Sequence, residues 1–280
     1  MSRPFSELVA DESWRREAEA WTAEQLGREG RRITGPVEQP RIRPWSTQLI
    51  VPTDAGRVWF KANCPGNAFE ARLQEVLAEL VPDDVDPPLA IDLARGWMLT
   101  ADHGPSLGDD REATEADWVA VATETARVQR ALVDQKASLL AAGLPDYAPP
   151  SVPERLDRLI ERLSDLPPDR PSHVTAELAR KLDRVRPVVA EASEQLERSS
   201  IPTTFQHGDI HPRNMWAAGD RLRLFDFGDA QWAFALEALC VPFGWIADQN
   251  VVSWTRVRDA YREHWTDLVD HREFEALWHA

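Results

Sequence analysis

The 280-residue sequence has only two cysteines, Cys64 and Cys240, and no long apolar run. Two cysteines are too few for a disulfide framework, and their spacing matches no metal-binding pattern. No apolar stretch approaches the roughly 18 residues of a membrane span, and the charged N-terminus lacks the apolar core of a secretory signal. We therefore expect a protein of the reducing cytoplasm that does not cross a membrane.

The sequence also lacks runs of lysine and arginine. Its 47 acidic residues outnumber its 32 basic residues, which gives a formal net charge of −15. This balance argues against nucleic-acid binding and against adhesion to anionic lipid. It suits a cationic small-molecule partner, although the same charge serves solubility equally well.

The first hundred residues predict a small sheet with helices at two places. Residues 12–27 have helical spacing of apolar side chains, and a second helical stripe begins after Asn67 and stops at Pro82. Four strand-like runs, each pair separated by turn-forming residues, predict two hairpins. The runs are residues 47–51, 57–61, 89–91 and 97–100.

After Gly108 the pattern becomes helical. Helical spacing recurs over residues 118–132, 153–163, 175–197 and 257–268. Pro187 predicts a kink in the third of these segments. A sheet followed by helices indicates the α+β class, with the change of character between Asp102 and Gly108.

Two motifs carry the functional information. The first is His207-Gly208-Asp209-Ile210-His211-Pro212-Arg213-Asn214, and the second is Asp226-Phe227-Gly228, which follows a short apolar strand. Phosphoryl transfer from a metal-bound nucleotide needs a carboxylate that orients the attacking hydroxyl and accepts its proton, and oxygen ligands for magnesium. Asp209 fits the first role, and Asn214 and Asp226 fit the second.

Two alternative hypotheses remain. His207, Asp209 and His211 have a spacing that could bind a transition metal, which would indicate a metallohydrolase. No third histidine cluster or cysteine pair accompanies them, and Asn214 and the Asp-Phe-Gly motif would then have no role. The other alternative is a nucleotide-binding protein without turnover.

In combination, these motifs resemble those of the aminoglycoside phosphotransferase and choline kinase family, the small-molecule relatives of protein kinases. The resemblance covers roughly residues 41–250. It implies a bilobal protein-kinase-like fold, with an N-terminal antiparallel sheet lobe that carries one helix and a mostly helical C-terminal lobe. We accordingly divide the chain into an N-terminal helical extension (1–40), a nucleotide-binding lobe (41–101), and a lobe with the catalytic loop and acceptor pocket (102–280).

The resemblance implies transfer of the γ-phosphoryl group of ATP, or of GTP, to a hydroxyl of a metabolite, amino sugar or antibiotic, with Mg²⁺ as cofactor. Asp209 would be the catalytic base, and Asn214 and Asp226 would bind the metal. Lys61 would bind the α- and β-phosphates as a point charge on a long stem. Glu70 would hold Lys61 in place.

The role of Glu70 has two competing interpretations. The segment Asn67-Ala68-Phe69-Glu70 also has the spacing of a helix capping box, in which Glu70 would bond the backbone of Asn67. Glu75, five residues further on, is a rival partner for Lys61.

The remaining nucleotide contacts follow from position in the family alone. The adenine would bond backbone groups around Thr100 to His103, with Thr100 and Asp102 as the named candidates. The phosphate-covering loop would contain Ser46 and Thr47, although no G-x-G-x-x-G motif is present.

The acceptor pocket is the least defined part of the sequence. Asp229, Trp232, Glu237 and Trp245 follow the second motif and could supply acids for an amine and aromatic rings for a cation or a ring. The alternative is that the tryptophans are core residues. No Ala-Pro-Glu segment follows Gly228, so a small molecule rather than a protein is the expected substrate.

Overall fold

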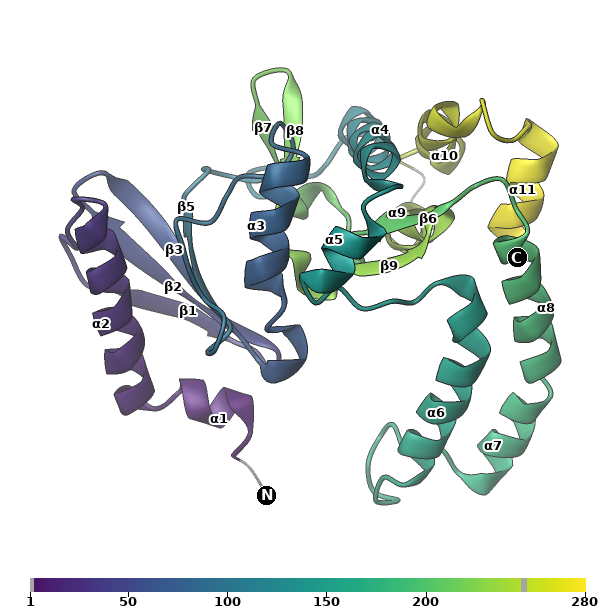
Figure 1. Cartoon of the computed structure of the whole chain (residues 1–280), viewed down its shortest axis with the longest axis horizontal. Helices are drawn as coiled ribbons and strands as arrows, with labels where there is room; N and C mark the ends of the chain where they lie inside the picture. The colour runs from purple at the N-terminus through teal and green to yellow at the C-terminus, as the bar shows by residue number, and fades with distance from the viewer. Residues whose placement is uncertain (1–2, 248–250) are drawn as a thin grey trace.

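A five-stranded antiparallel sheet forms the N-terminal part of the computed structural model, which describes residues 3–247 and 251–280 (Figure 1). The strand order is β1-β2-β3-β5-β4. Both predicted hairpins are confirmed, as β2–β3 and β4–β5. The strands are β1 (Glu38–Ile42), β2 (Ser46–Thr53), β3 (Gly56–Asn63), β4 (Ala90–Asp92) and β5 (Trp97–Ala101).

The sequence did not predict β1. This strand lies at the sheet edge, is mostly exposed and contains Pro40, so it has neither the alternation nor the composition of a central strand. Because proline cannot donate to a strand pair, it is tolerated only where one side of the strand has no partner.

Two N-terminal helices, α1 (Phe5–Val9) and α2 (Glu12–Arg28), accompany the sheet. The side chain of Asp11 caps α2 by accepting a hydrogen bond from the Ser13 N–H. The buried side of α2 shares a core with one face of the sheet, and four aromatic rings pack there in T-shaped pairs with centroids 5.3–6.1 Å apart. These rings belong to Trp14, Trp21, Phe60 and Trp97.

Strand alternation fixes which side chains of β3 face this core. Val58, Phe60 and Ala62 point into it, so Lys61 and Asn63 lie on the opposite face of the sheet. The packing of α2 therefore leaves Lys61 free to face the rest of the protein.

Helix α3 (Glu70–Leu80) lies between the sheet and the C-terminal helices in Figure 1. Its buried residues Leu73 and Leu77 belong to the same core as Val121, Phe227 and Trp232 from the C-terminal part. It ends before Pro82, as predicted. The helix thus packs with the C-terminal core rather than with the core under α2.

The C-terminal part is mostly helical and carries two short strand pairs, which confirms the predicted α+β fold class. Its strands pair as β6 (Thr203–Gln206) with β9 (Gln231–Phe234), and β7 (Met215–Ala218) with β8 (Arg221–Leu224). The helices are α4 (Glu115–Leu132), α5 (Lys136–Ala141), α6 (Val152–Ser164), α7 (Ala176–Asp183), α8 (Arg186–Glu197), α9 (Cys240–Ile246), α10 (Trp254–Arg262) and α11 (His271–His279).

Two helix predictions were wrong in detail. Residues 175–197 form two helices, because Pro187 occupies the first turn of α8, where its missing N–H costs no bond, instead of kinking one long helix. The last predicted helix stops at Arg262 and continues as a 3-10 turn, and the separate helix α11 was not predicted.

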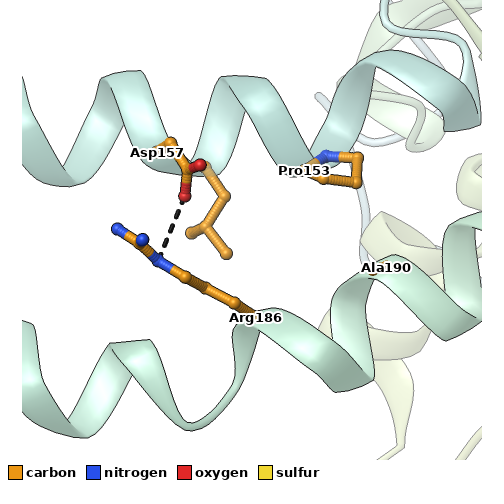
Figure 2. Close-up of a pocket in the computed structure, with 5 residues that line it drawn as sticks. Pro153, Asp157, Arg186 and Ala190 are labelled. Carbon is orange, nitrogen blue, oxygen red and sulfur yellow. Dashed lines mark ion pairs between the residues drawn. The ribbon is translucent and has the colours of Figure 1, made fainter.

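Helices α6, α7 and α8 extend away from the body as an arm (Figure 1). A cavity of about 280 Å³ separates α6 from α8. Figure 2 shows Asp157 and Arg186 facing each other across it, with Arg186 Nε 3.1 Å from Asp157 Oδ1. None of the residues lining this cavity belongs to the two sequence motifs.

The division of the chain at residues 40 and 101 stays a prediction. Residues 1–2 of the predicted extension, and residues 248–250 at the end of the predicted resemblance, lie outside the described residues. Across the described parts of the chain, no helix combines the length and the apolar character needed to cross a membrane.

Candidate active site

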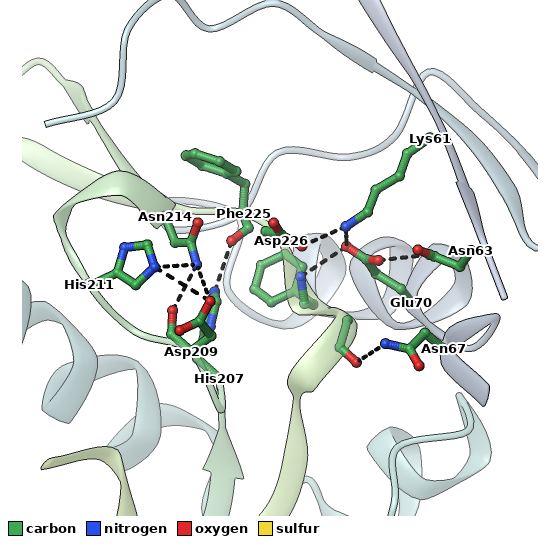
Figure 3. A network of polar contacts seen from close by, with 12 residues as sticks. Lys61, Asn63, Asn67, Glu70, His207, Asp209, His211, Asn214, Phe225 and Asp226 are labelled. Carbon is green, nitrogen blue, oxygen red and sulfur yellow. Dashed lines mark hydrogen bonds and ion pairs between the residues drawn. The ribbon is translucent and has the colours of Figure 1, made fainter. Parts of the chain in front are cut away.

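Lys61 on β3 contacts two carboxylates at once (Figure 3). Its Nζ lies 2.7 Å from Glu70 Oε1 and 2.6 Å from Asp226 Oδ1. Burial by itself would lower the pKa of Lys61, which is 6 % exposed, but the two negative charges outweigh burial and raise it. The lysine is therefore charged, and it joins α3 to the second motif.

Glu70, and not Glu75, is the helix residue that pairs with Lys61. Glu75 contacts Arg72 on its own helix. Glu70 is fully buried and accepts from Asn63 Nδ2 at 2.7 Å and from the Phe227 N–H at 3.0 Å. Burial raises the pKa of this carboxyl and the charge of Lys61 opposes the rise. Because all of its hydrogen-bond partners are donors, the ionised carboxylate is the form that these bonds satisfy.

The capping-box interpretation of Glu70 was wrong. Helix α3 begins at Glu70 itself, its N-cap is Phe69, and no side chain caps it. A 3-10 turn over Pro65–Asn67 precedes the helix, which directs the Asn67 side chain away from the helix end. Asn67 Nδ2 instead donates to the Gly228 carbonyl at 2.9 Å.

Asp226 has an unusual backbone. Its φ of 67° and ψ of 66° are left-handed, and it is the one non-glycine residue with positive φ in the described parts of the chain. A residue other than glycine costs about 1–3 kcal/mol in this conformation, so its neighbours must hold it there. The charge of Lys61 holds the pKa of Asp226 below its ordinary value, so this carboxylate is ionised.

His207 supports the residue before Asp226. Its ring is buried, and Nε2 lies 2.8 Å from the Phe225 carbonyl oxygen. Burial lowers the pKa of His207, so the ring is neutral and donates through Nε2–H. The histidine therefore braces the chain beside the metal-ligand candidate by one hydrogen bond.

The first motif places Asp209 and Asn214 together. Asn214 Nδ2 donates to the Asp209 carbonyl at 2.8 Å, and within the described residues no hydrogen bond reaches Asn214 Oδ1. His211 accepts from the Arg213 N–H through Nδ1, and its Nε2 lies 3.4 Å from Asp209 Oδ2. The hydrogen bond from His211 holds the pKa of Asp209 below its ordinary value. Asp209 is therefore an ionised, partly exposed carboxylate.

Gly208 is required where it stands. Its φ is +81°, and a Cβ built there would overlap the Asp229 carbonyl oxygen. Only glycine allows the loop of the first motif to lie this close to the chain that follows Asp226.

The oxygens of Asn214 and Asp226 fit a magnesium ion. The Asn214 amide is turned by its bond to Asp209 so that Oδ1 is available, and Asp226 has a second carboxylate oxygen besides the one on Lys61. Magnesium prefers such hard oxygen ligands and needs only one or two from the protein when it arrives with phosphates. The metallohydrolase hypothesis gains no support, since no group of three or more His, Cys, Asp or Glu side chains in residues 3–247 and 251–280 could hold a metal ion.

Among the other predicted nucleotide contacts, Thr47 and Asp102 have side chains bonded within the protein. The Thr47 hydroxyl donates to the Arg41 carbonyl and accepts from Gln39, both at 2.9 Å, and Ser46 is buried beside it. Asp102 accepts from Arg57 Nε at 2.7 Å and from Trp59 Nε1 at 3.3 Å. Thr100 pairs with Trp59 across β3 and β5.

The predicted acceptor residues lie in different surroundings. Asp229 follows the second motif, and burial together with the charges of Asp209 and Asp226 raises its pKa. Burial raises the pKa of Glu237 to about 7, although Gln231 Nε2 donates to it at 3.0 Å. Trp232 is a core residue, 2 % exposed, and offers no surface to a small molecule.

A cavity of about 460 Å³ borders the loop of the first motif. His211 lies between this cavity and Asp209, and Trp245 is the one predicted aromatic residue that lines it, with its ring 5.1 Å from that of His211. The lining residues are Gly108, Arg111, Glu112, Ala113, Trp118, His211, Pro212, Arg213, Trp245, Val251 and Val252.

Sequence reasoning missed Asn63 and Asn67. Asn63 follows Lys61 by two residues on the same strand, so period-two alternation could have identified it as a neighbour of the lysine. Asn67 bonds a residue 161 positions away, and no local pattern signals that contact.

Comparisons with known proteins concern the family and the fold of the chain. A family model described as "Phosphotransferase enzyme family" matches residues 68–277. No curated protein sequence matches the chain. Several solved structures match its fold. The three described next are each at most 16 % identical to this chain in sequence.

A macrolide 2'-phosphotransferase type I has a TM-score of 0.59 and 12 % identity, covering 88 % of this chain and 82 % of that one. The choline kinase LicA from Streptococcus pneumoniae has a TM-score of 0.59 and 15 % identity, covering 93 % and 85 %. The aminoglycoside phosphotransferase APH(3'')-Id from Streptomyces rimosus, in complex with ADP and streptomycin, has a TM-score of 0.53 and 16 % identity, covering 94 % and 97 %.

Proposed function

The chain belongs to the phosphotransferase enzyme family, and we propose that it moves the γ-phosphoryl group of ATP to a hydroxyl group of a small molecule. One observation carries the proposal. Lys61 joins the carboxylates of Glu70 and Asp226, and the backbone N–H of Phe225 bonds the Asn214 carbonyl at 3.2 Å, so the two motifs and β3 meet in one network. GTP is the second candidate donor.

The charges of this network suit a triphosphate. Lys61 would turn from Asp226 towards the α- and β-phosphates and stay paired with Glu70, which keeps its charge in place. Asn214 and Asp226 would hold a magnesium ion, whose charge stabilises the negative charge that develops on the phosphates. Asp226 is already ionised, so no proton has to leave it before a cation binds.

Asp209 would orient the acceptor hydroxyl and receive its proton. As the new oxygen–phosphorus bond forms, the bond from the γ-phosphorus to the bridging oxygen breaks and ADP leaves, while the hydroxyl proton passes to the Asp209 carboxylate. His211 and Asn214 fix the position of this carboxylate. Its low pKa makes it a weak base, so orientation is its main contribution.

The remaining nucleotide contacts are also proposals. The side chains of Thr47 and Asp102 are already bonded within the protein. We therefore assign the phosphate contact near Ser46 and Thr47 to backbone groups. The contact with the base near Thr100 and Asp102 is assigned to backbone groups for the same reason. Backbone N–H groups serve this purpose in other phosphate sites.

We place the acceptor at the cavity beside the catalytic loop. His211 lines this cavity and its Nε2 lies 3.4 Å from Asp209 Oδ2, and the exposed ring of Trp245 offers a flat apolar wall. Neither Asp229 nor Glu237 is among the residues that line this cavity, so the predicted contact of these acids with an amine of the acceptor stays a separate proposal. One fold relative was solved with streptomycin, and another is a choline kinase.

The test is a screen of hydroxyl-bearing compounds for ATP consumption, with the phosphorylated product identified by mass spectrometry. For a compound that scores, Asp209→Ala should lower turnover by at least about 100-fold and leave Mg-ATP affinity nearly unchanged. Asp220→Ala removes an exposed aspartate from the β7–β8 turn and is the matched control. Turnover within about tenfold of the parent in Asp209→Ala would contradict the assigned role.

The alternative of nucleotide binding without turnover makes a different prediction. Such a protein would bind Mg-ATP through Lys61 and Asp226 but would consume no ATP, even with water as acceptor. Calorimetric binding of Mg-ATP together with a long incubation assay for ADP separates the two functions.

A further inference from the structure

Asn63 and Asn67 stand at the two ends of the connection between β3 and α3, and each donates its side-chain amide into the active site (Figure 3). Asn63 is 4 % exposed, and its Nδ2 lies 2.7 Å from Glu70 Oε2. Asn67 Nδ2 lies 2.9 Å from the Gly228 carbonyl oxygen. Neither residue belongs to the two motifs, and neither is a candidate to contact a phosphate or the metal.

The bond from Asn63 fixes the orientation of Glu70. A carboxylate on a rotatable stem can turn, and Lys61 holds only its Oε1. Asn63 holds the other oxygen, so both ends of the carboxylate are bonded and its plane is set. The Lys61 amine is thereby presented at one position on the sheet face.

The bond from Asn67 acts on the chain around Asp226. The left-handed backbone of Asp226 persists only if the residues on both sides are held. His207 holds the Phe225 carbonyl, Glu70 holds the Phe227 N–H, and Asn67 holds the Gly228 carbonyl. Of these three residues, Glu70 also bonds Lys61 and Asn63, whereas Asn67 Oδ1 accepts only from the Cys64 thiol at 3.7 Å.

We propose that Asn63 and Asn67 are positioning residues, Asn63 for the Glu70 carboxylate that holds Lys61, and Asn67 for the left-handed turn that aims Asp226 at the metal. The inference rests on the proposed function, because it assigns the metal to Asp226 and the phosphates to Lys61. It predicts that the two asparagines have separable effects. Loss of Asn67 should alter magnesium dependence, and loss of Asn63 should weaken phosphate binding with or without metal.

The experiment uses the full chain and calorimetric binding of ADP, once with excess chelator and once across a magnesium titration. The variants are Asn63→Ala and Asn67→Ala. Gln74→Ala is the matched control, because Gln74 is a buried amide on α3 that donates to a backbone carbonyl, that of Asp86, at 3.0 Å, outside the site. Thermal unfolding of each protein reports the general cost of losing such a bond.

For Asn67→Ala we expect the magnesium concentration that half-saturates ADP binding to rise about fivefold to tenfold, the effect of one lost hydrogen bond. Its metal-free ADP affinity should stay within about twofold of the parent. Asn63→Ala should weaken ADP binding by about fivefold to tenfold in both conditions. Gln74→Ala should leave both binding constants unchanged, even if its unfolding temperature falls as far as those of the two asparagine variants.

The inference is overturned if Asn67→Ala and Gln74→Ala have the same magnesium dependence. If Asn67→Ala does not fold, the near-isosteric Asn67→Asp replaces it; a carboxylate facing the Gly228 carbonyl should raise the magnesium requirement further, and an unchanged requirement overturns the inference. Failure of the proposed function has a separate signature, since a parent protein without magnesium-dependent ADP binding would refute both, whereas a parent that binds but does not turn over ATP would refute only the function.

Discussion

Replacing Gly208 by alanine should destabilise the protein far more than the same change at Gly219. Both glycines have left-handed φ, +81° and +67°, so both substitutions carry the strain of an L-residue in this region, about 1–2 kcal/mol. A Cβ at Gly219 meets nothing within 4 Å, whereas one at Gly208 would overlap the Asp229 carbonyl oxygen. Relieving that overlap should add about 1–3 kcal/mol, the usual cost of overpacking.

Because both variants carry the backbone strain of a positive φ, the difference between their stabilities measures the cost of the overlap at residue 208 alone. In a chain of this size each kcal/mol lowers the unfolding temperature by about 2–4 °C. Gly219→Ala should therefore unfold roughly 2–8 °C below the parent, and Gly208→Ala roughly 4–20 °C below it. The pair is measured side by side, by thermal scans and by urea midpoints.

Gly208→Ala should also affect catalysis, because the residue precedes Asp209. A displacement of the base by about 1 Å is enough to cost roughly 100-fold in turnover. Gly219→Ala, in the exposed turn between β7 and β8, should keep the parent's turnover. Equal unfolding temperatures for the two variants, together with full turnover in Gly208→Ala, would refute the packing argument.

Three further predictions concern the site. His211→Phe removes the hydrogen bond that lowers the pKa of Asp209, so the acid limb of the turnover–pH profile should move to higher pH; an unmoved limb would contradict the assigned contact. Because its pKa is lowered, Asp209 also stabilises the folded protein above the pKa that it has in the unfolded chain, and this contribution is lost as pH falls through its folded pKa. His211→Phe should therefore reduce the difference in unfolding free energy between neutral and acid pH, measured by urea titration. Asp226→Asn should abolish the magnesium dependence of ADP binding, and a magnesium titration that matches the parent would place the metal elsewhere. Trp245→Ala should raise the KM of an identified acceptor by about tenfold without changing that of ATP, whereas Phe243→Ala, an equally exposed aromatic residue of α9 that does not line the cavity, should change neither.

The motif residues were predictable from sequence because their spacing is set by local chain geometry. Asp209 and Asn214 belong to one short loop, and Asp226 comes two residues after the short strand β8, so few arrangements separate them. The two hairpins were predictable for a similar reason, since turn residues flanked by alternating strands fix the pairing. These features depend on neighbours within about ten residues.

Other features depend on distant contacts, and the sequence does not signal them. The bond from Asn67 to Gly228 joins residues far apart in the chain, so Asn67 had the appearance of a helix cap. Trp232 and Trp245 have the same residue type and lie near each other in sequence, yet one is in the core and the other lines a cavity. Burial of this kind follows from tertiary packing, which residue type alone does not determine.

The position of α3 explains how Lys61 connects the two hydrophobic cores of the protein. Lys61 belongs to a sheet whose core is completed by α2, whereas Glu70 and Asp226 flank the C-terminal core that contains Leu77 and Phe227. The end of α3 is fastened to that second core, because buried Asp84 pairs with Arg127 on α4 and with Arg221 on β8.

The two contacts of Lys61 therefore cross from one core to the other. Both carboxylates are attached to the C-terminal core, whereas Lys61 is attached to the sheet. If the sheet shifted relative to that core, the Lys61–Glu70 and Lys61–Asp226 contacts would therefore stretch together. Glu70→Gln removes one of the two charges and keeps the shape, so it should lower the pKa of Lys61 and weaken ADP binding while both cores stay packed. If that variant instead lost its fold cooperatively, the Lys61–Glu70 pair would be a structural requirement of both cores and not a contact between them.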